Sequence, residues 1–296
     1  MSLYHKTVLA GEACDLLQVK KGRIYIDATL GGGGHSEEII KLGAFVWGLD
    51  WDQDALDFSQ NRLSRCCLDL GKKEKDCFIL KKGNFANLDK LYQLTEKPAG
   101  VLFDLGVSLH QLKTPERGFS FNDKGPLDMR MDRTLPVSAF DLVQKLSYGD
   151  LTYILMTYGE EKKARQIAGA IVSVRENLKI DNTTQLAEII SRVMGKKRGK
   201  IHPATKSFQA IRMAVNFEMD NLESGLKAAF KLLKAKGRLV VISFQPLEDQ
   251  LVYKFIKDLK NKNLALKAGK PFKPSFEEQK NNPSARSAVI RAIEKI

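Results

Sequence analysis

The sequence has few cysteines, and their spacing argues against two common kinds of site. Only four cysteines occur in 296 residues. None belongs to a CxxC pair, and none stands at zinc-ligand spacing from a histidine. We therefore expect reduced thiols, no disulfide framework and no metal site.

Long apolar runs are also missing. No run approaches the roughly 18 residues that a membrane-spanning helix requires. The opening MSLYHKTVLAGEACDLL contains no apolar segment of the signal-peptide kind. Because 43% of the residues are hydrophobic, the chain can still bury a sizeable core. We expect a soluble, cytoplasmic protein without a membrane partner.

The excess of basic over acidic side chains is absent from the first third of the chain and is carried by the other two thirds. Residues 1–110 contain 14 basic and 15 acidic side chains, a net charge of −1. Residues 111–215 contain 18 and 11, and residues 216–296 contain 16 and 9, so each region has a net charge of +7. A polyanionic partner such as nucleic acid would explain this distribution, and a merely basic surface is the alternative.

Short apolar runs bounded by turn residues predict buried parallel strands. They lie at 23–26, 44–49, 77–80, 101–103 and 238–244. Helical patterns separate the early runs, which predicts an α/β fold with a doubly wound, Rossmann-like parallel sheet.

The gap between the fourth and fifth expected strands is too long for one crossover. Repeated helical patterns fill it, at 148–158, 161–177 and 184–194. We therefore predict a mainly helical domain at 112–215, inserted into a sheet domain formed by 1–111 and 216–296, with the sheet resuming after a helix near 216–235.

A glycine-rich loop follows the first expected strand. It reads Asp27–Ala–Thr–Leu–Gly–Gly–Gly–Gly–His–Ser36 and opens a helix. Glycines let the backbone turn sharply and approach a ligand closely. Asp50 ends the second strand 23 residues after Asp27, where a carboxylate can accept both ribose hydroxyls of an adenosine. This arrangement predicts a nucleotide-type cofactor.

The acids around the loop favour one class of cofactor. Asp27 and Asp104 end the first and fourth strands, where they would repel the pyrophosphate of a dinucleotide. S-adenosylmethionine (SAM) carries a sulfonium and an ammonium group, which such carboxylates attract. We therefore prefer SAM to NAD. Phe85, after the third strand, could pack against the adenine or belong to the core.

An ordered series of motifs extends along nearly the whole chain. The motifs are His5–x–x–Val8–Leu9–x–x–Glu12, the glycine-rich loop, Asp104–Leu–Gly–Val–Ser108–x–x–Gln111, Arg117–Gly–Phe–Ser–Phe121, Leu127–Asp–Met–Arg–Met–Asp132, Tyr158–Gly–Glu–Glu161, His202–Pro–Ala–Thr–Lys–Ser–Phe–Gln–Ala–Ile–Arg212–x–Ala–Val–Asn216 and Ser243–Phe244–x–Pro246–Leu–Glu–Asp249. Their order resembles the MraW-type (RsmH) small-subunit ribosomal RNA cytosine-N4 methyltransferases.

This resemblance implies a SAM-dependent methyltransferase sheet with an inserted helical domain for substrate recognition. It implies methylation of the exocyclic N4 amine of a cytidine in the decoding region of 16S rRNA. The implied cofactor-binding residues are Gly33, Gly34, His35, Asp50, Phe85, Asp104 and Gln111. One signature departs from the family's Asn-x-Arg-Ser-Arg-Ser-Ala, because the stretch Asn282–Pro–Ser–Ala–Arg–Ser–Ala288 lacks one arginine.

The cytosine amine is a poor nucleophile, so its placement against the methyl donor matters most. We hypothesise that Asp104 is catalytic and, with Ser108 and Gln111, shapes the place where the methyl donor and the amine meet. A role of Asp104 in cofactor binding or turn capping alone is the alternative. Methylation at cytosine C5 is disfavoured, because it needs a cysteine nucleophile and no cysteine follows Cys77.

A basic stretch in the expected insertion predicts contact with RNA phosphates. Between Arg192 and Arg212 there are seven basic residues and no acid. Arg117, Phe119 and Arg130 are candidates for holding a displaced base and its phosphate, or for core packing. The RNA-binding candidates are therefore Arg117, Phe119, Arg130, Lys196, Lys197, Arg198, Lys206 and Arg212.

Two other classes of function stay open at the level of sequence. One is an NAD-dependent oxidoreductase, which cofactor-binding calorimetry would identify. The other is a non-catalytic RNA-binding assembly factor with a SAM pocket. The 16S rRNA substrate could be free or part of the small ribosomal subunit, and a homodimer is an alternative to a monomer.

Overall fold

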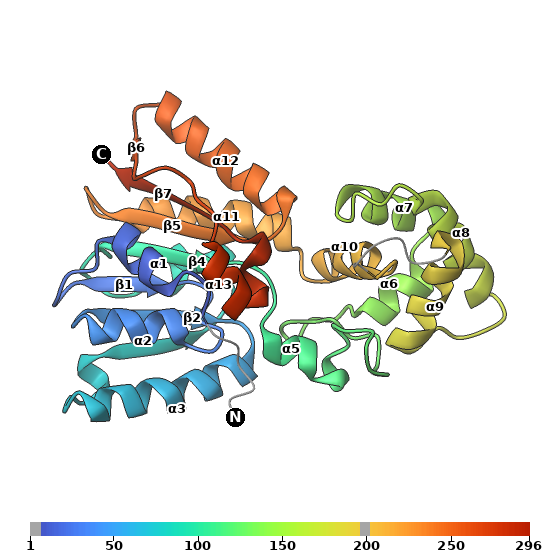
Figure 1. The fold of residues 1–296 in the computed structure, drawn as a ribbon, viewed down its shortest axis with the longest axis horizontal. Helices are drawn as coiled ribbons and strands as arrows, with labels where there is room; N and C mark the ends of the chain where they lie inside the picture. Colours follow the sequence, from blue (N-terminus) through green and yellow to red (C-terminus); the bar gives the residue numbers. More distant parts are fainter. Residues whose placement is uncertain (1–6, 196–201) are drawn as a thin grey trace. The chain divides into compact units, whose positions relative to one another are not determined.

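The computed structural model describes residues 7–195 and 202–296, and the chain forms two compact units (Figure 1). The sheet unit combines Tyr4–Gly106 with Met219–Ile296, and the insertion unit comprises Val107–Glu218. The predicted insertion at 112–215 falls inside the second of these ranges. In the described ranges, no helix combines the length and the apolar character needed to cross a membrane.

The sheet unit contains a seven-stranded sheet in the order β3-β2-β1-β4-β5-β7-β6. The strands are β1 (Ile24–Asp27), β2 (Phe45–Asp50), β3 (Phe78–Lys82), β4 (Gly100–Asp104), β5 (Arg238–Ser243), β6 (Ala265–Lys267) and β7 (Val289–Lys295). The first five strands are parallel, whereas β7 is antiparallel to both β5 and β6.

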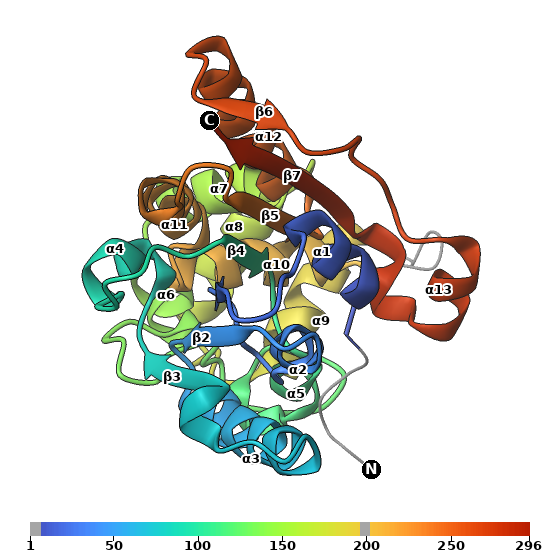
Figure 2. The ribbon, with the colours of Figure 1, turned by 90° about the vertical axis from the view of Figure 1, so that its left-hand side faces the viewer.

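Helices cover both faces of this sheet (Figures 1 and 2). One face carries α1 (Ala10–Leu17), α2 (Gly34–Lys41) and α3 (Gln53–Asp69), and the other carries α4 (Leu88–Leu91), α11 (Glu218–Leu232) and α12 (Pro246–Asn261). Neighbouring strand residues alternate between the two cores, as Tyr25 and Ile26 do on β1. Because both faces are buried, the strands read as continuous apolar runs.

The chain reverses its direction of progress across the sheet between β1 and β4. From β1 it proceeds outward through β2 and β3, and it then returns to β4 on the other side of β1. Ligands of open α/β sheets bind at such a switch point, outside the carboxyl ends of the strands. Asp27, Asp50 and Asp104 are the last residues of β1, β2 and β4, so all three lie at this edge.

The insertion unit is mainly helical. Its helices are α5 (Leu109–Lys113), α6 (Ala139–Lys145), α7 (Tyr148–Thr157), α8 (Ala164–Arg175), α9 (Thr183–Met194) and α10 (Thr205–Val215). Side-chain caps begin several of them, as Ser138 does for α6 and Asn182 for α9. The buried Asn216 ends α10, donates to the carbonyl of Met129 at 2.8 Å and accepts from the amide of Met131 at 2.8 Å.

The predicted fold class, a Rossmann-like sheet with an inserted helical domain, is confirmed, with one correction at the edge of the sheet. The five expected strands occur within about two residues of their predicted limits. The sheet is not wholly parallel, however, because β6 and β7 add an antiparallel edge that the sequence reading missed. β6 has only three residues, and β7, which follows the short helix α13 (Phe276–Asn281), contains Arg291, Glu294 and Lys295, so neither reads as a continuous apolar run.

Candidate active site

The glycine loop leads directly from β1 into α2. Gly31 and Gly33 have φ angles of 49° and 72°, in the left-handed region that favours glycine. Gly34 begins α2, and a Cβ atom there would collide with the Oγ1 atom of Thr7. Side chains at these positions would therefore strain the turn or displace its neighbours.

Two side chains of α3 hold the loop in this shape. The hydroxyl of Ser59 donates to the carbonyl of Gly31 at 2.7 Å. The guanidinium of Arg62 donates to the carbonyl of Gly32 at 3.1 Å and to Glu37 of α2 at 2.5 Å. Sequence reasoning did not identify Ser59 or Arg62. No local signal marks them, because their partners lie about 30 residues earlier.

Asp50 braces the other side of the loop. Its carboxylate accepts from the amide of Gly31 at 2.8 Å and from the amide of Asp52 at 2.9 Å. Each carboxylate oxygen keeps a further lone pair for a hydroxyl donor. Burial is the main reason that the pKa of Asp50 rises to about 7, and the two amide hydrogen bonds oppose it.

Asp104 lies beside the loop and pairs with His35. Its amide donates to the Oγ1 atom of Thr29 at 2.6 Å, which ties the end of β4 to the loop. Its Oδ2 atom lies 3.4 Å from the Nε2 atom of His35. Burial lowers the pKa of His35, but the carboxylates of Asp104 and Asp27 outweigh burial and raise it overall.

Asp27 is buried behind this pair. It accepts from the hydroxyl of Ser36 at 2.7 Å and from the amide of Thr29 at 3.3 Å. Burial is again the largest effect on this carboxyl group and raises its pKa. Asp27 therefore supports the loop from within, whereas Asp50 and Asp104 remain partly exposed at the edge.

Three polar atoms at this edge are buried without a hydrogen-bond partner among the described residues. They are the Oδ1 atom of Asp104 and both ring nitrogens of His35, although Nε2 lies within ion-pair distance of the Oδ2 atom of Asp104. Buried polar atoms are rarely left unsatisfied unless a ligand or water completes them. A cationic adenosine cofactor fits this site, because two carboxylates at the ends of β2 and β4 are bonded to the glycine loop and Asp104 keeps an unsatisfied acceptor.

Phe85 follows β3 in a short 3-10 helix and is half-buried. Its ring meets Phe103 edge-on, with centroids 5.4 Å apart, and a Cβ atom on Gly225 would lie 2.6 Å from its Cδ2 atom. Phe85 thus packs against β4 and α11. Contact with an adenine ring stays a prediction.

Gln111 belongs to the insertion unit. It forms a capping box with Ser108 at the start of α5: its Oε1 atom accepts from the Ser108 amide at 3.0 Å, and its own amide donates to the Ser108 hydroxyl at 3.2 Å. These bonds explain the motif Ser108–x–x–Gln111 structurally. A role of Gln111 toward the cofactor stays a prediction.

The RNA-binding candidates are in different structural situations. Arg117 is 2% exposed, and it donates to the carbonyls of Arg130 at 3.2 Å and Met131 at 2.9 Å. Arg212 is 8% exposed and pairs with Glu218 through two hydrogen bonds. Both arginines therefore hold the insertion unit together, and we assign neither to a phosphate.

The remaining RNA-binding candidates differ in how exposed their side chains are. Phe119 is buried, whereas the ammonium of Lys206 is exposed and donates to the carbonyl of Glu160 at 3.3 Å. Lys196, Lys197 and Arg198 lie outside the described residues. His202 accepts from the amide of Ala204 at 3.2 Å, within the turn that precedes α10.

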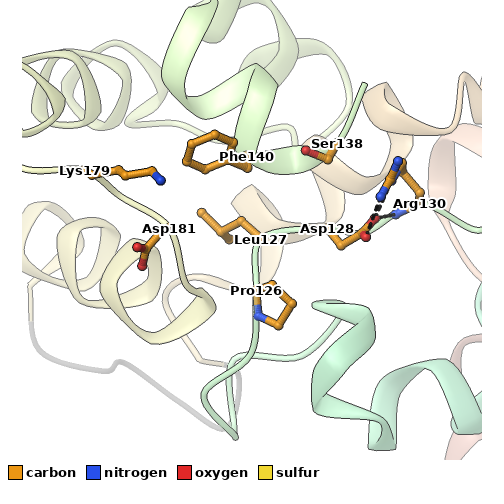
Figure 3. A pocket seen from close by; sticks show the side chains of 8 residues that line it. All are labelled: Pro126, Leu127, Asp128, Arg130, Ser138, Phe140, Lys179 and Asp181. Atoms are coloured by element: carbon orange, nitrogen blue, oxygen red, sulfur yellow. Dashed lines mark hydrogen bonds and ion pairs between the residues drawn. The ribbon is translucent and has the colours of Figure 1, made fainter. Parts of the chain in front are cut away.

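Arg130 lines a pocket of about 280 Å³ within the insertion unit (Figure 3). The lining residues are Pro126, Leu127, Asp128, Arg130, Ser138, Phe140, Lys179 and Asp181. Arg130 forms two hydrogen bonds with Asp128, at 2.7 and 2.8 Å, and Lys179 lies 5.0 Å from the centre of the Phe140 ring. The Arg130 and Lys179 side chains of this pocket therefore already interact with Asp128 and Phe140, respectively.

The chain is similar to known proteins over its whole length. Residues 2–296 match the model of the MraW methylase family. Proteins named "Ribosomal RNA small subunit methyltransferase H" from Carboxydothermus hydrogenoformans and Persephonella marina are 45% and 42% identical to it. The matches cover 100% and 99% of this chain, and 99% of each relative. The crystal structure of an rRNA methylase from Streptococcus thermophilus aligns over 98% of both chains, with 15% identity and a TM-score of 0.46.

Proposed function

Because the chain belongs to the MraW methylase family, we propose that it methylates the N4 amine of a cytidine in the decoding region of 16S rRNA. SAM is the methyl donor. The single observation that carries the proposal is the position of Asp104, beside the glycine loop with one carboxylate oxygen unsatisfied. The names of the full-length relatives support rRNA of the small subunit as the substrate.

The sheet unit supplies the residues that would hold the cofactor. Gly33 and Gly34 let the backbone approach it, and Asp50 would accept its ribose hydroxyls. The carboxylates of Asp27 and Asp104 make the edge attractive to a cationic ligand. When bound, SAM supplies an electrophilic methyl group.

Asp104 would act on the amine of the target base. The lone pair of this amine is delocalised into the ring, so correct placement contributes more than basicity. The free Oδ1 atom of Asp104 can accept a hydrogen bond from the amine and so aim its nitrogen at the methyl group. The amine must also lose a proton during or after transfer, and the same oxygen can receive it. The Nε2 atom of His35 lies 3.4 Å from the other oxygen, so a protonated His35 would favour the charged form of this carboxylate.

The sequence after β4 distinguishes this site from two other arrangements. Many amino-methyltransferases place an Asp/Asn/Ser-Pro-Pro-aromatic stretch there, whereas this chain has Asp104–Leu–Gly–Val. C5 methylation requires a cysteine nucleophile, and all four cysteines precede β4. Amine methylation with Asp104 as the hydrogen-bond acceptor fits both facts.

Nucleoside mass spectrometry of small-subunit rRNA tests the proposal directly. We expect N4-methylcytidine in the decoding region when the protein is present and its loss when the gene is removed. Assays on free 16S rRNA and on small subunits would identify the true substrate and so address the proposed ribosomal context. If no labelled methyl group reaches either RNA, the protein is better described as a non-catalytic assembly factor.

A further inference from the structure

A basic surface of the sheet unit lies far along the chain from the predicted RNA-binding residues. Residues 254–273 contain seven lysines and one acid, Asp258. The lysines are Lys254, Lys257, Lys260, Lys262, Lys267, Lys270 and Lys273, and all are exposed. In the described part of the chain, only Lys262 among them forms an ion pair, at 2.8 Å from Asp258. We call these seven residues the lysine strip.

Some exposed lysines on other helices have an acidic partner. Lys145 pairs with Asp141 and Lys227 with Glu223, each one helical turn away. In the lysine strip, by contrast, Lys254, Lys257 and Lys260 follow one another at intervals of three residues on α12. Like charges at this spacing repel each other and destabilise the helix. A polyanionic ligand would offset this repulsion.

The strip continues from α12 along the edge of the sheet. Lys267 is the last residue of β6 and pairs in register with Ile293 of β7. The chain then turns at Gly269, which has a φ of 89°, and Phe272 bridges to Ile290 of β7. Lys270 and Lys273 therefore follow β7, and Figure 2 shows this segment between β6 and α13.

The lysine strip ends at the same edge of the sheet as the candidate active site. Strand register places Asp104 of β4 beside Ile242 of β5. Ile242 is in turn beside Ile290 of β7, which bridges to Phe272. Phe272 is thus three neighbours away from Asp104 in one row across the sheet, about 15 Å at the usual strand spacing. Lys273 follows it at the same carboxyl edge.

An exposed aromatic side chain lies next to the end of the strip. Phe276, the first residue of α13, is 85% exposed. Its position is fixed locally, because the Ser275 hydroxyl caps α13 by accepting from the Glu278 amide at 3.1 Å. An aromatic ring beside lysines can stack an unpaired base while the lysines contact phosphates.

We propose that the lysine strip binds the phosphate backbone of the substrate rRNA and that Phe276 stacks on one of its unpaired bases. The inference rests on the proposed function for the identity of the RNA. It adds a second RNA-binding surface, on the sheet unit itself, and it explains why residues 216–296 carry a net charge of +7. RNA is favoured over an anionic membrane because the strip leads toward Asp104.

The test neutralises the end of the strip and compares it with a matched control. One variant carries Lys267→Gln, Lys270→Gln and Lys273→Gln. The control carries Lys72→Gln, Lys73→Gln and Lys75→Gln. These exposed lysines have no ion pair within the described ranges and lie next to β3, at the opposite edge of the sheet. Affinity for a decoding-region rRNA fragment is measured from about 50 to about 200 mM salt.

Loss of three phosphate contacts should reduce the slope of log affinity against log salt by about 2 to 3, and reduce affinity at least about ten-fold at the lower salt. The control should change affinity by less than about two-fold. Phe276→Ala should weaken binding about five-fold or more, and Phe276→Leu, which keeps an apolar side chain without a π-face, should weaken it similarly.

Equal slopes for the strip variant and the control would overturn the inference. The inference would also be overturned if the strip variant lost binding to phosphatidylserine vesicles while its RNA binding stayed unchanged. The strip would then be a membrane-binding surface. The RNA-binding assay does not depend on methyl transfer. Failure of the lysine-strip proposal can therefore be distinguished from failure of the proposed function. If wild-type protein binds RNA through the strip but leaves no N4-methylcytidine, only the proposed function is wrong.

Discussion

The Nε2 atom of His35 lies 3.4 Å from the Oδ2 atom of Asp104, although one residue lies in the first turn of α2 and the other ends β4. The pairing occupies one carboxylate oxygen and leaves the other, Oδ1, without a partner in the described structure. Asp104 is therefore a partly exposed carboxylate whose Oδ1 atom is buried and unsatisfied, which a ligand bound at this edge could complete. The predictions below test this arrangement and the loop around it.

Asp104→Asn should reduce methyl transfer by at least about 100-fold at saturating cofactor, because the amide cannot take up the proton of the amine. The fold should persist, since asparagine has nearly the same shape. Single-turnover assays with labelled cofactor measure the effect. Asp57→Asn, an exposed carboxylate on α3, serves as the control. Normal turnover by Asp104→Asn with unchanged cofactor affinity would leave the residue without a catalytic role.

Asp50→Asn should change how stability depends on pH. The pKa of Asp50 is raised to about 7 in the folded protein, above its ordinary value of 3.8. A raised pKa contributes stability that is fully present below pH 3.8 and is lost as the pH rises toward 7. Wild-type stability, compared with that of Asp50→Asn, should therefore fall across this window by at most about 1.4 kcal/mol per pH unit.

Urea unfolding of the cofactor-free protein at a series of pH values measures this difference. A constant difference between the two proteins from pH 4 to pH 7 would mean that Asp50 titrates normally. In calorimetry, the same substitution should weaken SAM binding at least about ten-fold, because an acceptor for the ribose hydroxyls is lost.

Ser59→Ala should weaken SAM binding indirectly, by loosening the glycine loop. It removes the 2.7 Å hydrogen bond that holds the carbonyl of Gly31. Loss of one such bond is worth about 1 kcal/mol, or about five-fold in affinity. Ser64→Ala is a suitable control on the same helix, because the Ser64 hydroxyl bonds only within α3, to the carbonyl of Gln60. Equal affinities for the two variants would show that the loop keeps its shape without Ser59.

The family assignment from the motifs is confirmed, and so is the preference for SAM, the methyl donor expected of a methylase family. Asp27, Asp50 and Asp104 could be placed together from sequence because strand ends are readable and parallel strands share one carboxyl edge. Ser59 and Arg62 could not, since contacts from a neighbouring helix leave no local pattern.

The basic residues show a second limit of sequence reasoning. Charge alone does not distinguish an arginine that faces solvent from one that is buried between carbonyls. Arg117, which the sequence suggested for RNA binding, is buried and donates hydrogen bonds to backbone carbonyls. The lysine strip, which the sequence did not suggest, is exposed. The difference arises from tertiary packing, which places Arg117 inside a turn and leaves one side of α12 uncovered.

The position of β7 has a consequence for how this protein is made. β7 lies between β5 and β6 in the sheet, but it is the last of the three to leave the ribosome. Until Val289–Lys295 has been synthesised, β5 has an open edge and β6 has no partner. The antiparallel edge of the sheet must therefore close after the cofactor-binding strands β1 to β4 have already been synthesised and are available for folding.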